Sequence, residues 1–170
     1  TVALGGLGVT GGVIWWLGAG SGEVTEEVAG PVYDSAPAFS LKTYDGQVVT
    51  LDTHSGQTRV INLWSTWCPF CVDELPEFAE LQKRYPDIVV IAINRAEIPR
   101  TALGYIENTL GSRDSLLWLD DPEDSYYQAI GGFAMPETLF VDGDGNIRVH
   151  KRGPIKLDEM SQIIEEISNG

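Results

Sequence analysis

The sequence has very little cysteine. Only two of its 170 residues are cysteine, and both stand in one short stretch, Ser65–Pro76, which reads STWCPFCVDELP. A single pair cannot form the framework of several disulfides that stabilises small secreted domains, and a chain of this length can bury a sufficient core without one. The scarcity excludes a disulfide-rich scaffold and leaves a metal clip, a single staple or a reactive dithiol.

Histidine is equally scarce, which argues against a metal site. A structural zinc site takes about four ligands, whereas this chain offers Cys68, Cys71 and two isolated histidines, His54 and His150. Covalent haem attachment needs a histidine directly after the second cysteine, and Val72 stands there. A disulfide that closes so small a loop would constrain the unfolded chain little. The pattern favours a reactive dithiol, with no metal and no cofactor beyond the disulfide itself.

Basic residues are also few. The chain has 11 Lys and Arg against 25 Asp and Glu, a net charge of -14. This balance argues against nucleic acid and anionic lipid headgroups as partners. It suits a basic partner surface or, equally well, a solvated acidic coat that keeps the protein soluble.

The first 22 residues lack ionisable side chains altogether, and all 36 charged residues, 11 basic and 25 acidic, come later. At about 1.5 Å per helical residue, such a run can cross a ~30 Å hydrocarbon layer. We therefore predict a membrane anchor over residues 1–22, followed by an acidic tether over residues 23–36. A cleaved signal peptide, which starts with basic residues, and a glycine-rich arm that docks on a partner protein are the alternatives.

The remaining residues, 37–170, alternate between strand and helix patterns and predict one α/β domain. Strand-helix-strand units that finish in a hairpin and a helix indicate a central mixed sheet with helices on both faces. In chain order we expect a hairpin over Phe39–Val49, a strand over Arg59–Ser65, a helix over Cys71–Tyr85, a strand over Asp87–Asn94, a helix over Thr101–Leu110, a short strand over Leu116–Leu119, a helical turn over Ser125–Ile130, a strand-turn-strand over Glu137–Arg152 and a helix over Leu157–Ile167.

The cysteines lie where a buried strand meets a helix N-terminus. Unpaired backbone N–H groups and the positive end of the helix dipole stabilise a thiolate at this position. In such settings the pKa of the first cysteine falls from ~8.5 into the range of about 3.5 to 7.5. We therefore predict Cys68 as the nucleophile and Cys71, one turn into the helix and more buried, as the resolving thiol.

These residues resemble the thioredoxin fold. WCPFC follows a strand, Pro76 stands five residues beyond Cys71, and GGFAMPETLF comes later, so the resemblance covers Ala36 to the C-terminus. It implies that the bond between Met135 and Pro136 is cis and faces the dithiol. X-Pro is the bond at which a cis peptide is energetically accessible.

Within that superfamily the chain resembles the membrane-tethered TlpA, ResA and DsbE (CcmG) branch. The shared features are the apolar N-terminal run, the N-terminal hairpin, a central insertion from about Ile98 to Leu119, and Pro-Glu-Thr at the cis-proline. Glu74 matches an active-site glutamate of that branch, and Asn62 replaces the buried aspartate of cytosolic thioredoxins. The resemblance implies a thiol-disulfide oxidoreductase outside the cytoplasm, with apocytochrome c as one client and a membrane thiol-disulfide protein as electron donor.

Further roles follow from the same resemblance. Glu74 is the candidate proton acceptor for Cys71, and the alternative is a solvated glutamate on the helix surface. Trp67 either shields the disulfide or belongs to the core.

The remaining candidate residues concern the client and the redox potential. The backbone around Met135 and Pro136 is expected to pair with an extended client segment, strand against strand. Pro69 and Phe70, between the cysteines, influence the reduction potential and border the client.

A function of another class stays open. An anchored thioredoxin-fold module could dock on a membrane complex or hand over copper, with Cys68, Cys71 and a histidine as ligands. His150 would serve only if its strand ends near the cysteines.

Overall fold

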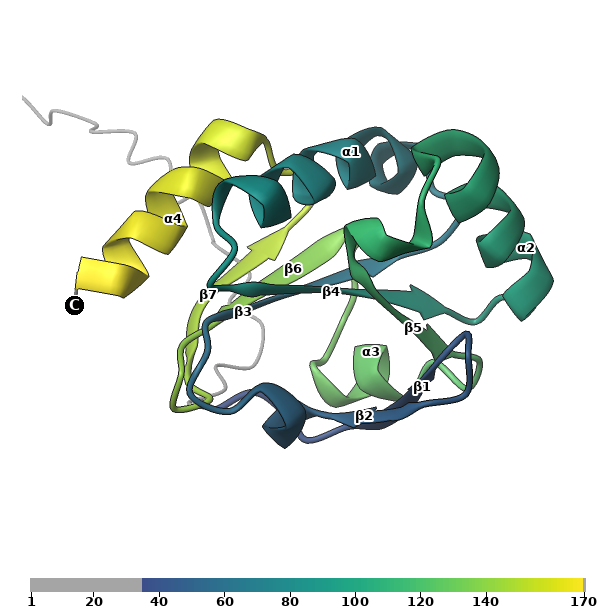
Figure 1. Ribbon diagram of the computed structural model, residues 1–170. Helices are drawn as coiled ribbons and strands as arrows, with labels where there is room; N and C mark the ends of the chain where they lie inside the picture. The colour runs from purple at the N-terminus through teal and green to yellow at the C-terminus, as the bar shows by residue number, and fades with distance from the viewer. Residues whose placement is uncertain (1–34, 170) are drawn as a thin grey trace, which may run out of the picture.

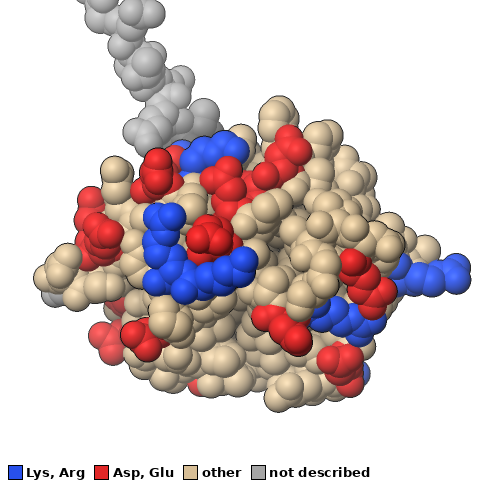
Figure 2. All heavy atoms as spheres, turned by 45° about the horizontal axis from the view of Figure 1, so that its top comes forward, with Lys and Arg blue, Asp and Glu red and all other residues tan. Residues whose placement is uncertain are grey.

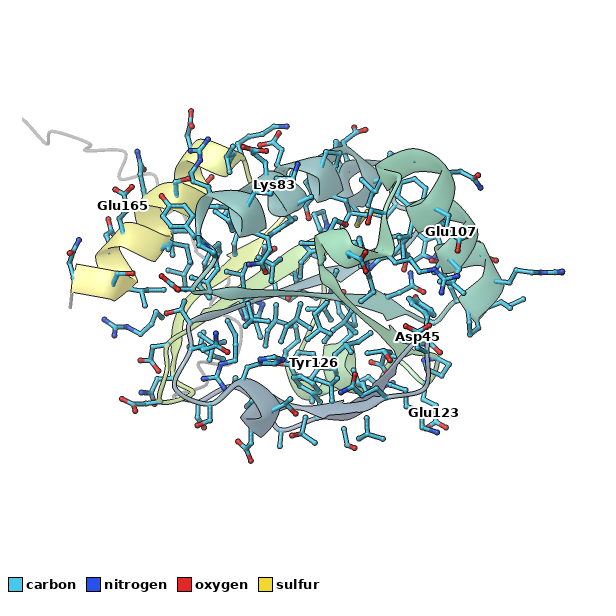
Figure 3. The ribbon with its side chains drawn as sticks, viewed as in Figure 1. Asp45, Lys83, Glu107, Glu123, Tyr126 and Glu165 are labelled. Atoms are coloured by element: carbon cyan, nitrogen blue, oxygen red, sulfur yellow. A yellow bond between two sulfur atoms is a disulfide. The ribbon has the colours of Figure 1, made fainter. Side chains whose placement is uncertain are left out.

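The computed structural model describes residues 35–169 (Figure 1). The predicted anchor, residues 1–22, and all but the last two residues of the predicted tether, 23–36, lie outside this range. Within residues 35–169, no helix combines the length and the apolar character needed to cross a bilayer.

A seven-stranded sheet forms the centre of the molecule, in the order β2-β1-β5-β4-β3-β6-β7. The middle strands β5, β4 and β3 run parallel to one another, and the outer strands pair antiparallel with their neighbours. The predicted mixed sheet and N-terminal hairpin are therefore confirmed. The strands are β1 (Ser40–Thr43), β2 (Val48–Thr50), β3 (Arg59–Trp64), β4 (Val89–Arg95), β5 (Leu117–Asp121), β6 (Glu137–Val141) and β7 (Ile147–Arg152).

Helices cover both faces of this sheet. In Figure 1, α1, α2 and α4 lie above it and α3 lies below, beside the hairpin. The helices are α1 (Pro69–Arg84), α2 (Pro99–Tyr105), α3 (Ser125–Ala129) and α4 (Leu157–Asn169), with short 3-10 or π segments η1 (Leu51–His54), η2 (Ile106–Leu110) and η3 (Arg113–Ser115). The central insertion is made of α2, η2, η3 and the beginning of β5.

The two faces of β3 explain why its sequence is mostly apolar, with Val60, Ile61, Leu63 and Trp64 among its six residues. All six of its residues are buried. Val60 and Trp64 belong to the cluster under α1 and α4, whereas Ile61 and Leu63 belong to the cluster on the α3 face. A strand covered on both faces loses the polar alternation of a half-exposed strand.

Two helices begin earlier than predicted. Helix α1 begins at Pro69 rather than Cys71, because a proline at the first helical position has no N–H to leave unsatisfied and its φ already suits a helix. The predicted helix over Thr101–Leu110 begins earlier, at Pro99, for the same reason, and its second half is the π segment η2.

Candidate active site

Cys68 and Cys71 form a disulfide at the junction of β3 and α1, with their Cα atoms 5.3 Å apart. Cys68 is the N-cap residue of α1, and its Sγ accepts a hydrogen bond from the backbone N–H of Cys71 at 3.2 Å. The helix N-terminus thus directs a donor and its positive dipole end at this sulfur. Both effects stabilise the Cys68 thiolate once the disulfide is reduced.

The two cysteines differ in access. Cys68 keeps 4% of its surface exposed, whereas Cys71 is fully buried at 0%. An incoming sulfur atom therefore meets Cys68 first, and Cys71 can attack only from within the protein. This order of access is what the predicted roles of nucleophile and resolving thiol require.

Glu74 lies one turn beyond Cys71 in α1 and is buried, with 1% of its surface exposed. Its Oε1 accepts a hydrogen bond from Asn62 Nδ2 at 2.7 Å, and its Oε2 accepts one from the backbone N–H of Ile155 at 3.1 Å. Burial raises the pKa of Glu74 to about 7, although these two hydrogen bonds act to lower it. The alternative of a solvated surface glutamate is therefore wrong. This carboxyl group can accept or release a proton near neutrality.

Asn62 connects this carboxyl group to the strand that follows the cis-proline. Its Nδ2 also donates to Thr138 Oγ1 on β6 at 3.1 Å. Asn62, which stands where cytosolic thioredoxins carry an aspartate, is thus a neutral hydrogen-bond donor to Glu74. Of these two buried residues, the ionisable one is Glu74 on α1 and not the residue on β3.

The bond between Met135 and Pro136 is cis, as the resemblance implies. Met135 packs on the hydrophobic cluster to which both cysteines belong. The loop is also held by α3. The Tyr127 hydroxyl donates to the Ala134 carbonyl at 2.9 Å, and a Cβ on Gly132 would overlap the Tyr127 ring.

A further carboxylate, Glu97, braces the segment before Cys68 and was not singled out from the sequence. Its Oε2 accepts from the Thr66 backbone N–H at 2.8 Å and from Asn94 Nδ2 at 2.7 Å, while its Oε1 accepts from Thr66 Oγ1 at 2.5 Å. The only sequence signal was its position just after β4, since the carboxyl ends of neighbouring parallel strands meet at one edge of a sheet.

Large aromatic side chains are exposed next to Cys68 and Cys71 in the sequence and just before the cis-proline. Trp67, Phe70 and Phe133 keep 59%, 60% and 59% of their surfaces exposed. The alternative of Trp67 as a core residue is therefore wrong. Pro69 is exposed between the cysteines. Sequence reasoning missed Phe133, whose signal was its position three residues before the cis-proline.

His150, the histidine of the copper-handling alternative, is already engaged by a carboxylate. Its Nε2 lies 2.6 Å from Oε2 of Glu137, the residue after the cis-proline. Within residues 35–169, no group of three or more His, Cys, Asp or Glu side chains is arranged to hold a metal ion.

Comparison with known proteins agrees with this geometry. The family model described as Redoxin matches residues 31–165. The chain belongs to the Redoxin family. Its predicted class, a thioredoxin-fold thiol-disulfide oxidoreductase similar to DsbE and ResA, is thereby confirmed.

Two relatives of this Redoxin-family chain align with most of its length. It is 29% identical over 144 residues to the thiol:disulfide interchange protein DsbE of Allochromatium vinosum, across 83% of this chain and 78% of that protein. It is 27% identical over 145 residues to the thiol-disulfide oxidoreductase ResA of Geobacillus thermodenitrificans, across 84% and 82%. A crystal structure described as a thiol:disulfide interchange protein DsbE from Chlorobium tepidum superposes with a TM-score of 0.72 at 23% identity, over 81% of this chain and 97% of that one. At that identity, the structural similarity establishes the fold alone.

Proposed function

We propose that this protein is an extracytoplasmic oxidoreductase that exchanges disulfides with client proteins through Cys68 and Cys71, tethered to a membrane by residues 1–22. The observation that carries the proposal is the arrangement of the two sulfurs. Cys68 is accessible at a helix N-terminus and Cys71 is fully buried behind it. The names of the relatives, thiol:disulfide interchange protein and thiol-disulfide oxidoreductase, describe the same reaction.

The reduced protein starts the reaction. The Cys68 thiolate attacks one sulfur of a client disulfide, so that a Cys68–client bond forms, the client S–S bond breaks and a client thiolate leaves. The helix N-terminus favours this step because it keeps a larger fraction of Cys68 ionised at neutral pH.

Cys71 completes the exchange. Glu74, as the carboxylate, takes the Cys71 proton, and the new thiolate attacks Cys68 Sγ, which releases the client as a dithiol. Two electrons pass to the client, and the protein is left with the disulfide seen in the structure. A pKa of about 7 suits Glu74 to this proton transfer.

The client binds across the cis-proline loop and the exposed aromatic side chains. An extended client segment pairs with the backbone of Met135, beside Pro136. The exposed side chains of Trp67, Phe70 and Phe133 provide apolar contacts to the client.

A membrane-tethered domain outside the cytoplasm would meet two kinds of partner, a client protein and an electron donor. Apocytochrome c before haem attachment is the client that the resemblance to the DsbE and ResA branch suggests. A membrane thiol-disulfide protein would return the dithiol to its reduced state. The proposed tether keeps the domain close to both.

The test is to trap the intermediate. Cys71→Ser leaves the nucleophile and removes the resolving thiol, so it should accumulate mixed disulfides that appear on a non-reducing gel and disappear with dithiothreitol. Cys68→Ser is the matched control and should trap none. If Cys68→Ser captured clients and Cys71→Ser did not, the assigned roles would be wrong.

A further inference from the structure

The loop before the cis-proline is held by the carboxylate that follows it. Glu137, the first residue of β6, is fully buried at 0% exposure. Its Oε1 accepts hydrogen bonds from the backbone N–H groups of Phe133 and Ala134, both at 2.8 Å. One carboxylate oxygen therefore fixes two consecutive peptide groups beside the proposed client-pairing backbone.

The other oxygen of Glu137 faces the edge strand β7. Oε2 lies 2.6 Å from Nε2 of His150 and 4.0 Å from Nε of Arg152. Burial acts to raise the pKa of Glu137, but the hydrogen bonds from His150, Ala134 and Phe133 outweigh it and the pKa is lowered. An ionised carboxylate only accepts hydrogen bonds, so Nε2 of His150 carries the hydrogen that it shares with Glu137.

Arg152 contacts the same loop from its exposed side. Its guanidinium carbon lies 4.7 Å from the centroid of the Phe133 ring. Tyr127, from α3, is another ionisable side chain near Glu137, and its hydroxyl donates to the Ala134 carbonyl. His150 and Arg152 of β7 thus both lie beside the Glu137 carboxylate, and Arg152 also contacts the exposed Phe133 ring.

The contact between His150 and Glu137 is better explained by the loop backbone that it positions than by a gain in the stability of the fold. A buried ion pair adds little net stability, because the cost of removing both charges from water offsets their attraction. The Glu137 carboxylate accepts hydrogen bonds from the loop backbone. On its other oxygen, His150 of β7 favours the charged form and holds the carboxylate in place.

We propose that His150 is a positioning residue for client binding, and that through Glu137 it holds the backbone of residues 133–135 where an extended client segment pairs. The inference rests on the proposed function, because it concerns the client site of that reaction. The dithiol itself lies at the junction of β3 and α1. Exchange with a small disulfide that makes no strand pairing should therefore not depend on His150.

The test compares His150→Leu and His150→Gln in the full chain. Leucine removes the donor, whereas glutamine places an N–H close to the position of Nε2. Arg148→Leu is the matched control, since Arg148 lies two residues earlier on β7 and pairs instead with Asp142. The reduced proteins are assayed with two substrates, an oxidised peptide with one internal disulfide and the small aromatic disulfide DTNB.

We expect His150→Leu to raise the KM for the peptide on the order of tenfold, with kcat and the DTNB rate within about twofold of wild type. His150→Gln should restore most of the lost affinity, and Arg148→Leu should match wild type. Amide hydrogen exchange gives a measure of the loop itself. Exchange at Phe133 and Ala134 should quicken in His150→Leu and not in the control.

Two results would overturn the inference. One is an unchanged peptide KM in His150→Leu, and the other is an equal loss with the peptide and with DTNB, which would place the effect on the dithiol or on folding. If His150→Leu does not fold, His150→Gln is compared with Arg152→Gln, which should raise the peptide KM and leave the DTNB rate unchanged. A wild-type protein that reduces DTNB but no peptide would refute the proposed function itself, and this inference with it.

Discussion

Replacing Glu74 with glutamine should make the stability of the protein less dependent on pH. Burial raises the pKa of Glu74 from an ordinary value of 4.5 to about 7. Between these values the folded protein keeps a proton that the unfolded chain has released. The free energy of unfolding therefore falls as the pH rises from 4.5 to about 7. At about 1.4 kcal/mol per pH unit, the loss amounts to about 3 kcal/mol.

Glutamine carries no charge, so this loss should be absent from the variant. Its amide also fits the contacts of the carboxyl group. The amide oxygen can accept from the Ile155 backbone N–H. The amide nitrogen can donate to Asn62 Oδ1 once the Asn62 amide turns over, because that atom is buried without a hydrogen-bond partner among the described residues.

Urea unfolding of the oxidised proteins at about pH 5 and about pH 9 measures the effect. The stability of Glu74→Gln relative to wild type should improve by about 3 kcal/mol between the two conditions. Glu77→Gln is the matched control, one turn further along α1. Burial acts to raise the pKa of Glu77, but hydrogen bonds from Lys156 and the Leu157 backbone outweigh it and the pKa is lowered. Above about pH 5 Glu77 is ionised in both the folded and the unfolded chain, so the stability of that variant relative to wild type should change little between the two conditions.

A stability difference between Glu74→Gln and wild type that stays constant with pH would refute the reasoning. It would mean that Glu74 ionises as an exposed glutamate does, and such a group would be almost fully deprotonated at neutral pH. Glu74 would then be a poor donor and acceptor for Cys71, and the proposed resolving step would need another base.

Three more substitutions test other parts of the site, and Gly104→Ala serves as the control for Gly132→Ala. Glu97→Gln should lower the melting temperature and slow thiol-disulfide exchange with a peptide severalfold, because it weakens the hydrogen bonds that hold Thr66. Calorimetry measures the melting temperature, and a peptide reduction assay measures the exchange rate. Gly132→Ala should cost about 1 to 3 kcal/mol in urea unfolding, since its Cβ overlaps the Tyr127 ring. Gly104→Ala, where a Cβ meets no atom within 4 Å, should not destabilise the protein. Phe133→Ser should raise the KM for peptides and leave the melting temperature near wild type, because the ring is 59% exposed.

Local sequence patterns were enough to predict the framework of the site. The apolar runs of β3 and β4 identify buried parallel strands, and the pair Cys68 and Cys71 follows β3 directly. A helix N-terminus stabilises a thiolate whatever packs around it, so the chemistry of Cys68 could be argued from the order of the elements. The cis bond at Pro136 came from the resemblance rather than from any local pattern.

The remaining features depend on contacts between distant parts of the chain. Glu74 stands beside other acidic residues at the start of α1, and its burial depends on contacts with Asn62 on β3 and with Ile155, 81 residues further along the chain. Glu97 reaches back 31 residues to Thr66. The partner of His150 lies 13 residues earlier, on the neighbouring strand. No periodicity or composition encodes such pairs, because they depend on strand register and loop conformation.

Glu74 and Glu137 are both buried, at 1% and 0% exposure, yet their pKa values are shifted in opposite directions. The difference lies in their partners. Glu74 receives two hydrogen bonds from neutral groups, whereas Glu137 receives two from the backbone and one from His150, with Arg152 at 4.0 Å. Environments that separate two carboxyl groups in this way give them separate tasks. Glu74 can carry a proton near neutrality, and Glu137 stays charged and accepts hydrogen bonds from the backbone N–H groups of Phe133 and Ala134. Glu74→Gln should therefore change the pH profile of exchange but not the KM for the peptide, and His150→Leu should do the reverse. If each variant changed both quantities, proton transfer and client positioning would be one coupled function of the site.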